Sequence, residues 1–163
     1  MKVILAVLLA SALSTYVMAD TVHQTSIGSA AYTGSGKSAL DVDQMETKDV
    51  EGGEVARVTS GMSQWGFVTY WMGVPTPSGE SIIRLKIWNT DEATATYAVY
   101  VSSKGGQEGL GQITIPEGSK PNSFVEVDFP VDSEREWSGI VLKKADKQEL
   151  PSPWIQSVQV ILP

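Results

Sequence analysis

The side chains that most often carry out catalysis are scarce in this chain. It has one histidine, His23, and no cysteine. A catalytic triad needs a base beside its nucleophile, and a zinc centre needs several nitrogen or sulfur ligands, so a single histidine supports neither. A glycosidase needs only two carboxylates, but the 19 acidic residues show no spacing on paired strands that singles out a catalytic pair. The sequence therefore predicts a protein without catalytic activity, with a small polysaccharide-cleaving enzyme as the alternative.

One short motif has the pattern of a nucleotide-binding loop. Residues 31–38, AYTGSGKS, fit a relaxed phosphate-loop pattern that closes on Gly-Lys-Ser. Such a loop leaves a buried parallel strand and opens a helix whose N-terminus holds the phosphate, and no helical pattern follows this motif. The chain also carries a formal charge of −7, which repels polyanions. We therefore expect neither a nucleotide nor a nucleic acid as its ligand.

Tryptophan is the residue type that points to a ligand. Sugars present flat patches of C–H groups that pack on aromatic faces beside hydrogen-bonding side chains. Four of the five tryptophans lie near expected strand ends or share a strand face with a polar residue. We expect them to be exposed, and the predicted ligand-binding residues are Trp65, Arg84, Trp88, Trp137 and Trp154. The alternative is that some of these rings only cap the open ends of a β-sandwich.

Strands must position these residues, because nothing after residue 20 sustains helical spacing. Apolar residues recur every second position between clusters of Gly, Pro, Asn and Asp. In residues 82–88, Ile83, Leu85 and Ile87 should face a core, and we expect this segment to form a hairpin with residues 96–101. The predicted strands are 67–74, 81–88, 96–101, 111–115, 123–129, 139–143 and 155–162, with another near 53–59. About eight strands without helices predict an all-β fold, an antiparallel β-sandwich of the jelly-roll type.

The N-terminus has the pattern of a secretory signal peptide. A lysine follows Met1, an apolar run spans residues 3–13, and small residues precede a predicted cut after Ala19. The alternative is a membrane anchor, but the apolar run is about half of the ~20 residues that span a bilayer. We expect residues 1–19 to be removed, residues 20–38 to be a leader or first strand, and residues 39–163 to form one domain. The mature protein would then be secreted or periplasmic, without a membrane span.

Several segments together resemble a known family of β-sandwiches. The order of residues 40–45 (LDVDQM), 52–56 (GGEVA), 65–75 (WGFVTYWMGVP) and 154–160 (WIQSVQV) is similar to that of galactose-binding-like domains. The resemblance is to carbohydrate-binding modules of the family 6 and 35 type, and it covers residues 40–163. One departure is that Pro153-Trp154 stands where the family often has an asparagine that contacts sugar.

The resemblance also implies a structural calcium ion that joins the first and last strands. In that family two carboxylates separated by one residue, here Asp41 and Asp43, bind calcium together with an acid on the closing strand. Gln156 stands in that third position, and its amide oxygen can still bind calcium but supplies no negative charge. The alternative is two solvated carboxylates without a metal.

Two classes of partner remain open for such a sandwich. The first is a carbohydrate ligand bound by a non-catalytic module. The second is an envelope protein, or another component of an extracellular assembly, that packs on exposed aromatic rows.

Overall fold

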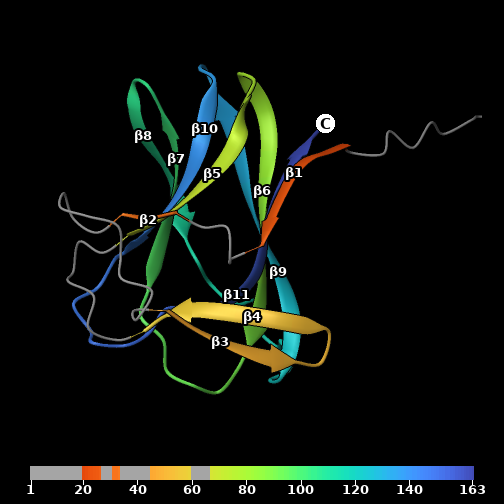
Figure 1. Ribbon diagram of the computed structural model, residues 1–163, viewed down its shortest axis with the longest axis vertical. Helices are drawn as coiled ribbons and strands as arrows, with labels where there is room; N and C mark the ends of the chain where they lie inside the picture. Colours follow the sequence, from red (N-terminus) through yellow and green to blue (C-terminus); the bar gives the residue numbers. More distant parts are fainter. Residues whose placement is uncertain (1–19, 27–30, 34–44, 60–66) are drawn as a thin grey trace, which may run out of the picture.

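The structure is a computed structural model that describes residues 20–26, 31–33, 45–59 and 67–163. In these residues eleven strands form two antiparallel sheets that pack face to face (Figure 1). The first sheet contains β3 (Met45–Val50), β4 (Gly53–Val58), β11 (Trp154–Leu162), β6 (Gly79–Asn89) and β9 (Ser123–Ser133), and β1 (Asp20–Ser26) also pairs with β11. The second sheet contains β2 (Ala31–Thr33), β5 (Phe67–Thr76), β10 (Trp137–Lys144), β7 (Tyr97–Ser103) and β8 (Gly106–Gln112). The prediction of an all-β antiparallel sandwich is confirmed. Within the described ranges no helix is long and apolar enough to cross a membrane.

Alternating apolar residues build the core between the two sheets. In β6, Ile83, Leu85 and Ile87 are buried, as the sequence predicts, and Val99 and Val101 of β7 belong to the same apolar cluster. Full burial of such a side chain stabilises the fold by about 1.5–3 kcal/mol relative to exposure. Because a shift by one residue would turn these side chains outward, the core fixes the register of each strand.

The expected hairpin between residues 82–88 and 96–101 is wrong. β6 lies in the first sheet between β11 and β9, whereas β7 lies in the second sheet between β10 and β8. The connecting residues 90–96 therefore cross from one sheet to the other. Main-chain N–H groups donate the hydrogen bonds that hold this crossing: Ala95 donates to the Pro151 carbonyl at 2.8 Å, and Thr96 donates to the Asp146 carboxylate at 2.6 Å. The crossing places polar side chains at one open end of the sandwich.

The strand expected at residues 111–115 is also displaced. It is β8 and spans Gly106–Gln112, because the chain turns back directly after β7 and pairs with it from Gly106 onward. Gly106 has a φ of 128°, which favours glycine in this tight turn.

The β3–β4 hairpin runs across the long strands of the first sheet (Figure 1) and covers Trp88 and Trp154 on its outer face. Only one residue pair, Ile155 with Ala56, joins β4 to β11 in register. Further hydrogen bonds attach the hairpin: the Gln156 amide donates to the Gly52 carbonyl at 2.8 Å, the Val58 N–H donates to the Ser152 hydroxyl at 3.0 Å, and the Ser152 N–H donates to the Val58 carbonyl at 3.0 Å. A second apolar cluster, separate from the main core, fills the space beneath the hairpin and contains Val50, Val55, Trp88, Phe124 and Trp154.

Candidate functional site

A polar pocket opens at the end of the sandwich where β6 ends and β11 begins. Its volume is about 360 Å³, and Trp88 and Trp154, which are directly paired in register, lie side by side in its wall. We call it the Trp88–Trp154 pocket. Its polar lining residues are Asn89, Thr90, Glu92, Thr94, Thr96, Gln112 and Thr114. Hydroxyl and amide groups beside aromatic rings suit a polyhydroxylated ligand.

Most of the polar wall comes from the crossing segment and from residues just past β8. Thr94 and Thr96 lie on the crossing, and Thr114 follows β8. A threonine hydroxyl can shape a loop by binding a nearby main-chain group, as the Thr90 hydroxyl does by accepting from the Glu92 N–H at 2.8 Å. The loop that leaves β6 is thereby shaped by its own side chains, and it brings the Glu92 carboxylate to the rim of the pocket.

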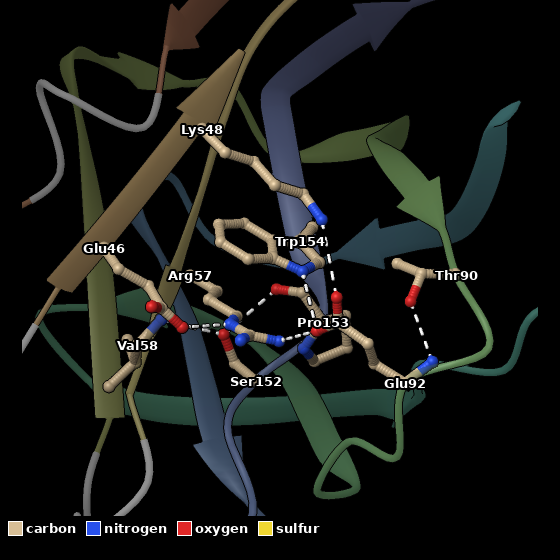
Figure 2. Close-up of polar contacts among 9 residues, drawn as sticks. All are labelled: Glu46, Lys48, Arg57, Val58, Thr90, Glu92, Ser152, Pro153 and Trp154. Atoms are coloured by element: carbon tan, nitrogen blue, oxygen red, sulfur yellow. Dashed lines mark hydrogen bonds and ion pairs between the residues drawn. The ribbon is translucent and has the colours of Figure 1, made fainter. Parts of the chain in front are cut away.

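Five side chains form a clasp, namely Trp154 and the four that lie around its indole (Figure 2). The Trp154 Nε1–H donates to the Glu92 carboxylate at 3.3 Å, while Lys48 Nζ and the Arg57 guanidinium carbon lie 4.2 and 4.1 Å from the ring centroid. Lys48 Nζ is 3.6 Å from Glu92, and Arg57 forms ion pairs with both Glu92 and Glu46. The clasp ties β3 and β4, which carry Glu46, Lys48 and Arg57, to the crossing segment and to β11. We call these five residues the Trp154 clasp.

The electrostatics of the clasp keep Glu92 ionised. Partial burial of this carboxylate favours its protonated form, but hydrogen bonds from Arg57 and Trp154 and the charges of Arg57 and Lys48 outweigh burial and hold the pKa of Glu92 below its ordinary value. Among the described residues that line the pocket, Glu92 is the only one with an ionisable side chain. Since two cations offset its charge, the described lining suits a neutral ligand.

The expectation of exposed tryptophans is wrong for the three whose side chains are described. Trp88, Trp137 and Trp154 retain 9, 1 and 4% of their surface. Trp88 and Trp154 are covered because the β3–β4 hairpin crosses over them, and Phe124 packs edge-on against Trp88 with ring centroids 5.0 Å apart. Trp137 is part of the main core near the opposite end of the sandwich. Trp65 lies outside the described residues.

Arg84 is not brought to the pocket. It lies in the middle of β6 and binds Asp128 through two hydrogen bonds of 2.8 Å, with Glu126 at 3.2 Å. Cross-strand pairing explains this, because Arg84 lies directly opposite Asp128 in the register of β6 and β9. The predicted ligand-binding set therefore divides: Trp88 and Trp154 share one pocket, while Arg84 and Trp137 lie elsewhere.

The predicted calcium ligands are only partly described. Asp41 and Asp43 lie outside the described residues, and the Gln156 amide nitrogen is engaged with the β3–β4 turn. In the part of the chain that the structure describes, no three His, Cys, Asp or Glu side chains cluster as metal ligands. The calcium site stays a prediction.

Sequence reasoning missed Glu92, the clasp cations and the threonines of the pocket. The only signal was that residues 89–96 are rich in Asn, Thr, Asp and Glu, which reads equally well as an ordinary turn. Their role depends on the crossing between sheets and on the path of the β3–β4 hairpin.

Solved structures with this fold include several carbohydrate-binding modules. The family 35 carbohydrate-binding module from Clostridium thermocellum matches with a TM-score of 0.55 and 12% identity, over 86% of this chain and 99% of the module. The unliganded CBM1 module of BiXyn10A matches with a TM-score of 0.56 and 11% identity, over 88% of this chain and 99% of the module.

Part of a larger enzyme also matches. An exo-β-1,3-galactanase from Phanerochaete chrysosporium has a TM-score of 0.53 and 15% identity, over 86% of this chain but only 29% of the galactanase, so the chain spans less than a third of that protein. No protein-family model and no curated protein sequence matches the chain. The resemblance inferred from the sequence is confirmed at the level of fold: the chain has the β-sandwich fold of carbohydrate-binding modules.

Proposed function

We propose that this chain is an exported, non-catalytic carbohydrate-binding protein whose glycan binds in the Trp88–Trp154 pocket. The observation that carries the proposal is the composition of this pocket, in which hydroxyl and amide side chains line the wall together with two tryptophans. The fold shared with carbohydrate-binding modules supports the same proposal.

The pocket acts through its polar wall more than through an aromatic platform. Because Trp88 and Trp154 are only 9 and 4% exposed, neither ring offers a sugar an open face on which to stack. The ionised Glu92 can accept hydrogen bonds from sugar hydroxyls, and the threonine hydroxyls and the Gln112 amide can donate or accept. We therefore propose a neutral sugar as the ligand.

Affinity electrophoresis of residues 20–163 through gels that contain neutral polysaccharides tests the proposal. Retardation on at least one polysaccharide, lost in Gln112→Ala and Thr94→Val, is expected. Gln148→Ala is the matched control, because Gln148 is an exposed glutamine outside the pocket.

Absence of retardation on every polysaccharide, with and without calcium, would contradict the proposal. A stable complex with an envelope protein that forms without sugar would support the alternative of a structural sandwich. Release of reducing ends from any polysaccharide would contradict the non-catalytic part.

A further inference from the structure

A mainly apolar pocket lies on the outer face of the first sheet, beside the end of β11 and away from the β3–β4 hairpin (Figure 1). Its volume is about 340 Å³, and we call it the Ile82 pocket. Three apolar residues on neighbouring strands line it as one row, since Ile82 lies directly opposite both Ile161 of β11 and Pro130 of β9. The residues that alternate with this row, such as Ile83 and Val160, are buried in the core, so the row faces outward.

The charges on the two sides of this apolar row differ. On one side Arg84 is paired with Asp128 and Glu126. On the other side Glu80 and Asp132 lie directly opposite each other, and both are exposed and line the pocket. The side chain of neither acid forms an ion pair or hydrogen bond with another described residue. Because like charges opposite each other on paired strands are destabilising, a cation placed between these two carboxylates would be favourable.

The spacing of the apolar row and the acid pair matches an extended peptide. Ile82 and Glu80 are two positions apart on β6, so they face the same side of the sheet about 7 Å apart. Residues two positions apart in an extended peptide have the same separation. A peptide that runs along the strands can therefore place an apolar side chain on the Ile82 row and a basic side chain beside Glu80 and Asp132. The volume of the pocket is at the lower end of the range for ligand sites, about 300–1,000 Å³, which suits one such pair of side chains.

Two other occupants of an apolar sheet face fit the charges less well. The two carboxylates repel the headgroups of anionic lipids. A second copy of this chain carries the same formal charge of −7, so two copies also repel each other.

We propose that the Ile82 pocket docks an extended segment of a partner protein in which an apolar residue is followed, two positions later, by lysine or arginine. The apolar side chain packs on Ile82, Ile161 and Pro130, and the cation binds Glu80 and Asp132. This docking site is independent of the proposed glycan site, because Ile82 and Trp88 lie about 20 Å apart along β6.

Titration of residues 20–163 with the blocked peptide Gly-Leu-Ser-Lys-Gly, followed by the isoleucine methyl signals in NMR spectra, tests the site directly. At pH 7 the lysine is protonated and the carboxylates are ionised. The Ile82 and Ile161 signals should shift, while the indole N–H signal of Trp154 stays in place. Three control peptides should bind at least threefold more weakly: Gly-Leu-Ser-Glu-Gly reverses the charge, Gly-Ser-Ser-Lys-Gly lacks the apolar side chain, and Gly-Leu-Lys-Ser-Gly changes the spacing.

Variants of the pocket separate the two contacts. Glu80→Gln with Asp132→Asn should weaken binding of Gly-Leu-Ser-Lys-Gly by about threefold to tenfold, as expected for two exposed charge contacts. Ile82→Thr keeps a β-branched residue in the strand and should weaken binding by about threefold, because it removes apolar contact area. Asp91→Asn with Glu117→Gln changes the net charge equally at two exposed acids outside the pocket and should leave the affinity unchanged.

Unshifted Ile82 and Ile161 signals, equal binding of any control peptide, or unchanged affinity in the double variant of Glu80 and Asp132 would each overturn the proposal. Shifts of the same signals with phosphatidylcholine vesicles would favour a membrane surface instead, and shifts that grow with protein concentration alone would favour a second copy. Glycan binding is followed by the Trp154 signal and by Gln112→Ala, so either site can fail while the other stands.

Discussion

Replacing Glu92 with glutamine removes the negative charge at the centre of the Trp154 clasp while it keeps an acceptor for the indole N–H. The side chains of Lys48 and Glu92 are 33 and 47% exposed, and an exposed ion pair contributes about 0.2–1 kcal/mol to the free energy of unfolding. Arg57 is only 14% exposed, and in the variant it still forms its ion pair with Glu46. Losing the ion pair with Glu92 therefore costs about 1 kcal/mol once solvent screening of Glu92 is included.

The expected loss for Glu92→Gln is therefore about 1–2 kcal/mol of unfolding free energy, or a fall in Tm of about 3–6 °C for a domain of this size. Glu92→Ala should cost about 1 kcal/mol more, since the Trp154 N–H then loses its acceptor. Urea unfolding of residues 20–163, followed by circular dichroism and by tryptophan fluorescence, measures both variants.

Glu126→Gln is the matched control. Glu126 also forms an ion pair with an arginine, but it is 51% exposed, and Arg84 keeps its two hydrogen bonds to Asp128. Glu126→Gln should lower the free energy of unfolding by less than about 0.5 kcal/mol. If Glu92→Gln is no more destabilised than Glu126→Gln, the clasp does not hold the β3–β4 hairpin and the reasoning above is refuted.

Four further predictions concern the pH dependence of stability, a glycine of the β3–β4 turn, calcium and the N-terminus. Hydrogen bonds from Arg84 and from the Thr96 N–H lower the pKa values of Asp128 and Asp146. The stability that these two carboxylates contribute is present above the ordinary carboxyl pKa of about 4, and it should be lost as the pH falls through their lower folded pKa values. Unfolding curves at stepwise lower pH measure this loss, and Asp146→Asn should remove part of the pH dependence. Gly53→Ala should cost about 1 kcal/mol more than Gly79→Ala in urea unfolding, although both glycines have positive φ. A Cβ at Gly53 would lie 2.7 Å from Gln156 Nε2, so that side chain must move and give up its hydrogen bond to the Gly52 carbonyl, whereas a Cβ at Gly79 would meet no atom within 4 Å. Calcium should raise the Tm of residues 20–163 relative to a chelator, and Asp41→Asn with Asp43→Asn should abolish the rise; an unchanged Tm would leave these carboxylates without a metal. Mass spectrometry of the exported chain should show a first residue of Asp20, and retention of residues 1–19 would contradict the signal peptide.

The sequence predicted the sandwich because its core follows a local rule. The alternation of Ile83, Leu85 and Ile87 places three side chains on one face of a strand whatever the rest of the chain does. Which strands become neighbours follows no such rule: the turn-forming residues 89–92 fit a hairpin equally well, and the crossing to the second sheet depends on contacts with residues 145–151, far along the chain. The pocket was therefore not predictable, since its wall is made by that crossing.

The tryptophans show why residue type alone misplaced the binding surface. A flat aromatic face can pack on a sugar or on another part of the same chain, and sequence patterns do not distinguish the two. Here the β3–β4 hairpin covers Trp88 and Trp154, and two cations occupy positions over the Trp154 ring. Replacement of these rings should therefore act first on stability, whereas replacement of Thr94 or Gln112 should act on ligand affinity without unfolding the protein. If Gln112→Ala unfolds the sandwich while Trp154→Phe leaves its stability unchanged, this division between a structural aromatic pair and a polar binding wall is wrong.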